Sequence, residues 1–404
     1  MARIMMFFGM AVGVFCEISA NFVDKNISMR TLFTIMIAAL CCIGMKPCTS
    51  AIVSGKITKS GRVMMWKHRD TGKEDGKVER IEARNGRMAY VAVYDAIDRK
   101  NREAWAGMNT AGFAVMNTAS YNLKNDKVKD KDMDKEGLLM TVALGTCRTV
   151  DDFERLLKTY HRPMCVEANF GVVDAQGNAA YFETNNYSYT RINLSEAENG
   201  ALVRTNYSHT GRVDEGYGYI REANANCLLA PHIAARDIVP ATFTEELSRS
   251  FYHSLIDRDF SQMGLQWIVD QDFIPRRSSV ATIVFEMPAP GEDPSLATMW
   301  IGLGYPPCSE IRAVWCTPDG LPDELRGTLP NGHSPLCDRT VEMKHKVFPI
   351  QRGNGQSYLN ISLLYNEQGT GYCQIMKQKN LLYYQTVYEE LDRRRKALVN
   401  KSIE

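Results

Sequence analysis

Cys48 is the residue of this 404-residue chain whose chemistry says most, because it closely follows an apolar leader. If the chain is cut before Cys48, that residue becomes the first of the mature protein. It then supplies both a thiol nucleophile and a free α-amine. An α-amine has a reference pKa of roughly 7.7–8.0, so it can accept the thiol proton near neutral pH. Cys48 could therefore act as a nucleophile that carries its own base.

Four further segments carry charged or amide side chains near the ends of predicted strands. They are residues 66–72 with Lys67, Arg69 and Asp70, residues 107–122 with Asn117, residues 202–209 with Asn206, and residues 276–285 with Arg276 and Arg277. Cations near a thiol lower its pKa, and amide N–H groups stabilise a developing oxyanion. Taken singly, the asparagines are typical of turns and the Arg/Lys–Asp group is typical of a surface ion pair. Their combination with Cys48 indicates a site.

The first 47 residues contain two apolar stretches, 4–14 and 32–44. Each is shorter than the roughly 20 residues that span a bilayer. The second stretch has the layout of a signal peptide, with Met29 and Arg30 before an apolar centre and small residues near Gly44. We expect Met29 to be the true start, residues 1–47 to be removed as a signal and pro segment, and the mature protein to be exported without a membrane span. A membrane-anchored N-terminus is the alternative.

Composition narrows the class of partner. The chain has 48 basic and 47 acidic residues, so it lacks the basic footprint of a nucleic-acid-binding protein. It contains no Cys-x-x-Cys, no paired Cys/His spacing and no His-Glu-x-x-His, so we predict neither a metal nor a cofactor. A small molecule is the expected partner, and homo-oligomerisation is left open. Eight cysteines follow the leader, and their pairing cannot be deduced from the sequence.

Periodicity and turn residues predict a layered α+β chain. Strands are expected at 49–54, 62–66, 87–94, 112–116, 279–285 and 298–303, a hairpin at 170–183, helices at 137–147, 150–160, 242–253 and 375–400, and a solvated charged loop at 122–136. Two consecutive helices between groups of strands do not fit a βαβ alternation. We expect one domain over residues 48–370, with a C-terminal helix in residues 371–404 docked on it.

In this order the motifs resemble the choloylglycine hydrolase and isopenicillin-N acyltransferase superfamily of N-terminal-cysteine linear amide hydrolases, to which acid ceramidase is also related. The resemblance covers residues 48–315. It is carried by Cys-Thr at 48–49, Trp-Lys-x-Arg-Asp-Thr at 66–71, Gly-Met-Asn-x-x-Gly-Phe-Ala at 107–114, the hairpin at 169–183, and Thr-Asn at 205–206. It implies a four-layer αββα sandwich of the N-terminal-nucleophile type. It also implies cleavage of N-acyl amides through a cysteine thioester, by hydrolysis or by acyl transfer.

The resemblance also implies roles for the residues around the nucleophile. Cys48 would attack the amide, and Asp70 would orient the freed α-amine. Bile salt hydrolases have an arginine three residues before this aspartate, where the present chain has Lys67. Arg69, which directly precedes Asp70, is therefore the favoured cation, and Lys67 is its rival and a candidate substrate-binding residue.

The remaining implied roles concern the oxyanion and the thiol. Asn206 would donate its side-chain amide to the oxyanion, and Asn117 would donate a backbone N–H. Arg277 matches the superfamily's late arginine near the thiol, and Arg276 is its rival. Tyr187, Tyr217 and His209 are candidate substrate-binding residues.

Other hypotheses remain open at this stage. One is a bile salt hydrolase proper, although the segment at 66–71 is closer to the acyltransferase-like branch. Another is a papain-like Cys/His enzyme, for which His209 would be the histidine to consider because it lies near Asn206. A third is an exported binding protein of the same fold that has lost processing.

Overall fold

The computed structural model describes residues 48–401, which contain two antiparallel β-sheets. The six-stranded sheet has the order β10 (Ala201–Arg204), β1 (Thr49–Val53), β2 (Met64–Asp70), β14 (Ser279–Glu286), β15 (Thr298–Leu303) and β16 (Arg312–Val314). The seven-stranded sheet runs in chain order through β3 (Gly76–Ile81), β4 (Tyr90–Asp95), β5 (Ala106–Asn109), β6 (Ala114–Ala119), β7 (Ala168–Val173), β8 (Ala179–Thr184) and β9 (Tyr189–Asn193). The predicted leader lies outside the described residues.

The two sheets pack face to face over an apolar core. Met65 and Ile283 of the six-stranded sheet and Val91 and Met116 of the seven-stranded sheet are fully buried in one cluster. These residues alternate along their strands with residues of the outer clusters, as the period of two requires. Each sheet therefore has two apolar faces, one of which faces the other sheet.

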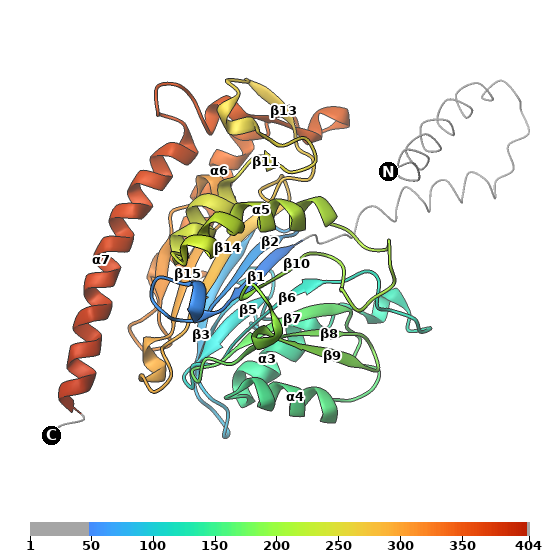
Figure 1. Ribbon diagram of the computed structural model, residues 1–404, viewed down its shortest axis with the longest axis vertical. Helices are drawn as coiled ribbons and strands as arrows, with labels where there is room; N and C mark the ends of the chain where they lie inside the picture. The colour runs from blue at the N-terminus through green and yellow to red at the C-terminus, as the bar shows by residue number, and fades with distance from the viewer. Residues whose placement is uncertain (1–47, 402–404) are drawn as a thin grey trace, which may run out of the picture. The chain divides into compact units, whose positions relative to one another are not determined.

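Helices cover the two outer faces (Figure 1). Helices α3 (Glu136–Thr146) and α4 (Val150–Thr159) bury Leu144 and Phe153 against the seven-stranded sheet. Helices α5 (Tyr219–Ala235) and α7 (Tyr372–Lys401) bury Leu229 and Tyr384 against the six-stranded sheet. A further helix, α6 (Pro335–Val347), begins at the cap residue Ser334. The fold is the predicted four-layer αββα sandwich.

The helix predicted at 242–253 is confirmed only over residues 242–249, and it is not an α-helix there. The chain forms a π-helix at Thr242–Glu246 and a 3-10 helix at Leu247–Arg249, and the short strand β11 (Tyr252–His253) follows. The predicted capping box between Thr242 and Glu245 does not form, because each of these side chains makes a hydrogen bond to another residue. Thr242 accepts a hydrogen bond from the Val239 nitrogen, and the buried Glu245 accepts one from Asn380 of α7. Helix α5 was missed, since Pro231 lies inside it and its apolar residues form no clear stripe.

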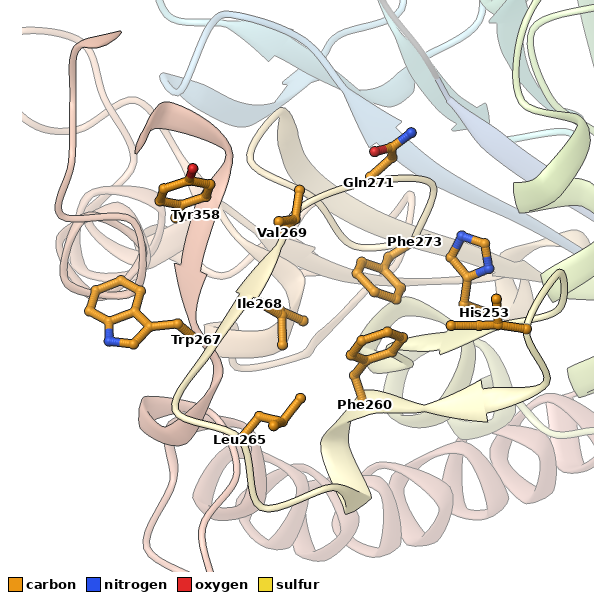
Figure 2. Close-up of a pocket in the computed structure, with 10 residues that line it drawn as sticks. His253, Phe260, Leu265, Trp267, Ile268, Val269, Gln271, Phe273 and Tyr358 are labelled. Atoms are coloured by element: carbon orange, nitrogen blue, oxygen red, sulfur yellow. The ribbon is translucent and has the colours of Figure 1, made fainter. Parts of the chain in front are cut away.

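Two small antiparallel ribbons lie at one end of the molecule. One joins β11 to β12 (Arg258–Asp259), and the other joins β13 (Trp267–Val269) to β17 (Tyr358–Asn360). Figure 2 shows the side chains that they place around a hollow. The sequence analysis did not predict this region.

The eight cysteines among the described residues are all free thiols, and most of them are buried. Between residues 48 and 401 no helix combines the length and the apolar character that crossing a membrane would require.

Candidate active site

Strand pairing places Cys48 beside the end of β2. Cys48 directly precedes β1, in which Thr49 pairs with His68 and Ser50 pairs with Lys67. Its Sγ lies 3.8 Å from the backbone oxygen of Asp70, and the residue is only 5% exposed. A cavity of about 30 Å³, enough for a water molecule, adjoins the thiol. Its lining comes from both sheets and includes Lys67, Arg69, Asp70, Trp105, Asn117 and Glu136.

The Cys48 nitrogen is held by Asn206. It donates to Asn206 Oδ1 at 2.8 Å, while Asn206 Nδ2 donates to the Ala119 oxygen at 2.9 Å. Sequence reasoning assigned the amine to Asp70 and gave Asn206 only an oxyanion role. The structure instead places the carbonyl end of the Asn206 amide on the nitrogen of the candidate nucleophile.

Arg221 is a site residue that sequence reasoning missed. This side chain from the first turn of α5 is buried, and its Nη1 donates to the Cys48 oxygen at 2.6 Å. Its Nη2 donates to Asn206 Oδ1 at 2.8 Å. Gly218 makes room for it, because a Cβ there would lie 2.3 Å from Arg221 Nη2. The only available signal would have been a prediction of helix α5 itself.

Lys67 joins the two sheets next to the thiol. Its Nζ donates to the Trp105 oxygen at 2.8 Å and to Asn117 Oδ1 at 2.9 Å. Burial lowers the pKa of Lys67 to about 8, and the neighbouring Arg69 lowers it too, whereas Cys48 acts in the opposite direction. Lys67 is therefore a buried amine whose charge depends on pH in the mildly alkaline range. The Asn117 side chain serves as its acceptor.

Arg69 lies on the same face of β2, but its charge is paired elsewhere. Its Nη2 contacts Asp95 Oδ1 at 2.7 Å, and its guanidinium lies over the Trp105 ring. Asp95 also pairs with Lys73. Of the two rival cations, Arg69 is ion-paired with Asp95, whereas Lys67 Nζ donates to the neutral Trp105 oxygen and Asn117 Oδ1 beside the thiol, so we carry Lys67 forward in place of Arg69.

Asp70 belongs to a buried polar chain on the other face of β2. Its Oδ1 accepts from Ser279 Oγ at 2.6 Å, and its Oδ2 lies 3.1 Å from Arg276 Nε. His68 Nε2 contacts the same Ser279 hydroxyl at 2.7 Å. Burial, reinforced by Arg276 and Arg221, holds the pKa of His68 well below its usual value. His68 is therefore neutral at physiological pH.

The late arginine near Asp70 is Arg276, not Arg277. The Arg277 guanidinium donates to the Ile350 and Gln356 oxygens and to the Gln351 side chain. Both arginines precede β14, and the turn closed by the Ser279 nitrogen and the Arg276 oxygen directs the Arg276 side chain to Asp70 and leaves Arg277 on the other side.

The three other candidates lie away from the thiol. Tyr187 is 53% exposed, and Tyr217 packs edge-on against Tyr121 while its backbone pairs with Asn206. His209 contacts Glu222 at 2.9 Å. Among the described residues no histidine has a hydrogen bond or ion pair with Cys48, which disfavours a papain-like Cys/His pair.

A cross-strand pair fixes the loop that carries Asn206. Asn169 on β7 lies directly opposite Glu183 on β8. Asn169 Nδ2 donates to the Thr205 oxygen at 3.3 Å and to the Tyr207 oxygen at 3.1 Å. These two carbonyls flank Asn206, so one buried amide holds the backbone on both sides of it.

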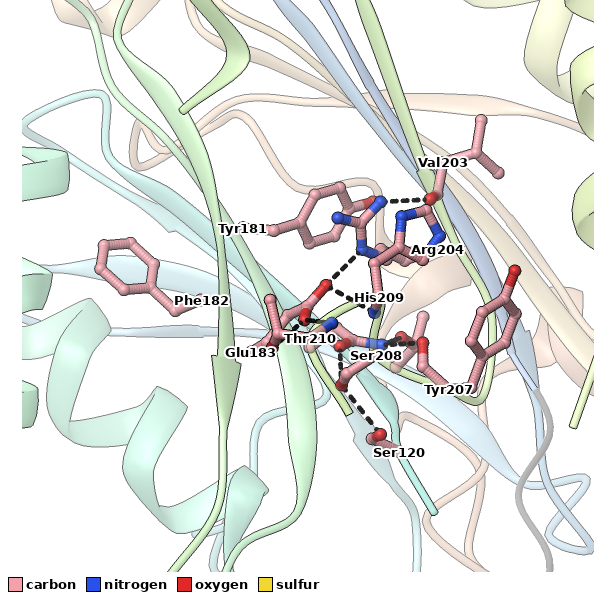
Figure 3. A network of polar contacts seen from close by, with 12 residues as sticks. Ser120, Tyr181, Phe182, Glu183, Val203, Arg204, Tyr207, Ser208, His209 and Thr210 are labelled. Carbon is pink, nitrogen blue, oxygen red and sulfur yellow. Dashed lines mark hydrogen bonds and ion pairs between the residues drawn. The ribbon is translucent and has the colours of Figure 1, made fainter. Parts of the chain in front are cut away.

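Glu183 holds the rest of the loop (Figure 3). Its Oε1 accepts from Arg204 Nε at 2.7 Å and from the His209 nitrogen at 3.0 Å, and its Oε2 accepts from the Thr210 nitrogen at 2.8 Å. Burial raises the pKa of Glu183, but Arg204 and the Thr210 bonds outweigh it and hold the pKa below its usual value. The carboxylate is therefore charged at neutral pH. Both members of this pair come from the hairpin motif noted in the sequence.

No group of three or more His, Cys, Asp and Glu side chains within residues 48–401 has the geometry of a metal site. What the arrangement offers is acyl-transfer chemistry: a thiol and its own backbone nitrogen in one place, a cation beside them, and an amide that contacts the nitrogen.

Comparison with known proteins gives one family match. Residues 81–253 match the family model of acyl-coenzyme A:6-aminopenicillanic acid acyl-transferase. No curated protein sequence matches the chain.

Three solved structures are similar to the chain at low sequence identity. The N-acylethanolamine-hydrolyzing acid amidase ortholog of Caenorhabditis elegans has 14% identity and a TM-score of 0.39, over 61% of this chain and 93% of that one. The conjugated bile acid hydrolase of Clostridium perfringens has 12% identity and a TM-score of 0.41, over 66% and 92%. Penicillin V acylase of Agrobacterium tumefaciens has 14% identity and a TM-score of 0.38, over 66% and 86%.

Proposed function

From its membership in the choloylglycine hydrolase and isopenicillin-N acyltransferase superfamily of N-terminal-nucleophile hydrolases, we propose that this protein is an exported amidase that uses Cys48 as its N-terminal nucleophile. The observation that carries the proposal is the contact between the Cys48 nitrogen and Asn206 Oδ1, with the thiol beside the end of β2. Removal of residues 1–47 would convert that nitrogen into an α-amine that is already held in place.

The reaction begins with transfer of the Cys48 thiol proton to its own α-amine. The thiolate then attacks the carbonyl carbon of the amide, and an oxyanion forms. Asn206 has a second role here: Nδ2 carries two hydrogens, and we propose that it donates to the oxyanion as well as to Ala119. Donors of this kind are each worth on the order of 3–4 kcal/mol in comparable sites.

Collapse of the tetrahedral intermediate breaks the C–N bond. The α-ammonium of Cys48 returns its proton to the leaving amine, and the acyl group remains on Sγ as a thioester. Water, activated by the α-amine, hydrolyses the thioester and regenerates the thiol. An acceptor amine in place of water would make the same site an acyltransferase.

The cations around Cys48 have different roles in this reaction. Lys67, on the cavity side, stabilises the thiolate in its charged form. Arg221 donates to both the Cys48 carbonyl and Asn206 Oδ1 and thereby holds them together, so it is a positioning residue. Asp70 with Arg276 and Ser279 forms the wall on the opposite face of β2.

The proposed substrate is a linear amide that joins an apolar acyl group to a small polar amine. N-acyl amino acids, bile acid conjugates and side-chain-acylated β-lactams all belong to this class. The net charge of +1 gives no steering toward polyanions.

The deciding experiment measures the N-terminus and activity together. We expect intact mass and N-terminal sequencing of the purified protein to show a chain that begins at Cys48 and hydrolyses N-acyl amides in a substrate screen. A mature chain that retains Pro47 and has no amidase activity would contradict the proposal and favour an exported binding protein. Activity that is lost with EDTA and restored by zinc would also contradict it.

A further inference from the structure

The two ribbons described above surround an apolar hollow of about 630 Å³ that the proposed mechanism does not use (Figure 2). This volume lies within the range of roughly 300–1,000 Å³ typical of small-molecule pockets. Eight of its ten lining residues are apolar or aromatic: Ile256, Phe260, Leu265, Trp267, Ile268, Val269, Phe273 and Tyr358. These eight residues, together with His253 and Gln271, are called the ribbon pocket.

The apolar lining of the ribbon pocket is open to solvent. Trp267 is 42% exposed, Val269 is 53% exposed and Tyr358 is 41% exposed, whereas Phe260 and Phe273 form the interior. Apolar side chains that gather around one hollow are expected to bind a ligand or partner, since leaving them in water costs free energy.

The two polar residues of the pocket also point to a ligand. His253 Nδ1 is buried and has no hydrogen-bond partner within residues 48–401. Buried polar atoms normally have a hydrogen-bond partner, so a buried nitrogen without one beside a pocket indicates where a polar atom of a ligand could bind. Figure 2 shows His253 and Gln271 at the edge of the hollow, with the aromatic rings between them and Trp267. Apolar surface with polar atoms at one side suits an amphiphile.

One segment connects the ribbon pocket to the proposed active site. Val269, Gln271 and Phe273 line the pocket, while the alternate residues Asp270 and Asp272 have partners outside the pocket lining. The Asp270 carboxylate accepts from the Arg277 nitrogen at 2.7 Å, directly beside Arg276.

The second half of this connection runs through α5. The Asp272 oxygen accepts from Asn224 Nδ2 at 2.9 Å, and Asn224 Oδ1 accepts from the Ser254 nitrogen next to His253. Asn224 lies one helical turn after Arg221, which contacts Cys48. The pocket wall is thus attached to the same helix as Arg221.

We propose that the ribbon pocket binds the apolar chain of an amphiphilic small molecule, such as a medium-chain carboxylate or the acyl group of an amide. The chain would lie between Phe260, Phe273 and Trp267, and the polar head would be at the side of His253 and Gln271. For the acyl group of a substrate, this inference rests on the proposed function. For a free carboxylate it does not.

Trp267 provides a direct test, because it is the one exposed tryptophan of five. The others, Trp66, Trp105, Trp300 and Trp315, are at most 9% exposed. The full chain carrying Cys48→Ala is titrated with sodium dodecanoate below its micellar concentration. We expect a saturable blue shift of tryptophan fluorescence, since ligand burial removes Trp267 from water. A shift that is absent or does not saturate would overturn the proposal.

Variants at the exposed rim test the location without disturbing the core. We expect Val269→Glu and Tyr358→Ser each to weaken dodecanoate binding at least tenfold. Leu382→Glu is the matched control, because Leu382 is 66% exposed on α7 and does not line the pocket. Unchanged binding in the folded rim variants, or equal weakening by Leu382→Glu, would place the ligand elsewhere and overturn the proposal.

Kinetics separates the two sources of the ligand. Competitive inhibition of amide turnover by dodecanoate would identify the pocket as the site of the substrate's acyl chain. Binding without competition would identify a separate amphiphile site, and either result supports the ribbon pocket. If the wild-type enzyme is active but the Cys48→Ala chain shows no shift, the pocket alone is rejected. If the Cys48→Ala chain shows the shift but the wild-type protein is inactive, the proposed function alone is rejected.

Discussion

The Cys48 site and the ribbon pocket differ in how their polar and apolar groups are used. Around Cys48 nearly every side chain is buried, and Asn206, Arg221, Lys67 and Asp70 each have at least one hydrogen-bond partner, although Asp70 Oδ2 and Arg221 Nε have none within residues 48–401. In the ribbon pocket Trp267, Val269 and Tyr358 are exposed, and the buried His253 Nδ1 has no partner within the same residues. A site in which each group already has its place is preorganised for chemistry, because no reorganisation is needed during the reaction. A site with open apolar surface is suited to binding.

The largest expected effect is the loss of activity in Cys48→Ala. The variant should have no detectable amidase activity because no other group supplies both nucleophile and base. Product formation from an N-acyl amide, measured by mass spectrometry, checks this. Cys227→Ala is the matched control, since Cys227 is an exposed free cysteine. Turnover by Cys48→Ala at the wild-type rate would contradict the nucleophile assignment.

Asn206→Ala should come next. Removal of one oxyanion donor should lower kcat by about a hundredfold or more. Because Asn206 Oδ1 accepts from both Cys48 and Arg221, truncation also leaves two buried donors without an acceptor, and stability should fall by about 1–3 kcal/mol. Steady-state kinetics and urea unfolding measure the two effects. An unchanged kcat would move the oxyanion site elsewhere.

A smaller effect on catalysis is expected when the loop loses its support. Glu183→Gln removes the charge opposite the buried Arg204, and leaving one charge of such a pair uncompensated costs about 3–5 kcal/mol. We expect a lower Tm and a kcat reduced by roughly tenfold through displacement of Asn206. Thr210→Val, which removes only one hydroxyl donor to Glu183, should have a weaker effect on both. A folded Glu183→Gln enzyme with normal kcat would show that the loop does not depend on this carboxylate.

The pH dependence of Lys67 gives the smallest effect. Burial, the main cause, lowers the pKa of Lys67 from 10.5 to about 8. Between pH 8 and 10.5 the unfolded chain then binds a proton that the folded chain does not, so this residue makes stability rise with pH over that window, by about 3 kcal/mol in total. Activity should fall in the same window as the cation beside the thiol is lost.

The Lys67 prediction is checked by urea unfolding and kcat/KM profiles between pH 6 and 10. Lys67→Met should abolish the rise in stability and lower activity at pH 7. Lys67→Arg should retain part of the activity, and its kcat/KM should fall only at a higher pH than that of the wild type. If Lys67→Met kept the wild-type pH profile, the loss of kcat/KM at alkaline pH would arise from the titration of another group.

Several strands and site residues of this protein could be predicted from the sequence alone. Local residue patterns predicted β1, β14 and β15, and the turn residues at 174–178 predicted the hairpin of β7 and β8. The motif order predicted Cys48, Asp70 and Asn206 as neighbours, and the structure brings them together.

Only the tertiary structure decided how these residues are connected. The contacts of Cys48 with Asn206 and Arg221 join residues 158 and 173 positions apart, and no local pattern encodes such distances. The turn that precedes β14 decided that Arg276, not Arg277, contacts Asp70. The ribbon pocket has no sequence motif, because its lining comes from two ribbons that close only when β13 pairs with β17 from another part of the chain. The sequence thus determines which groups are available, and packing between distant segments determines which of them meet.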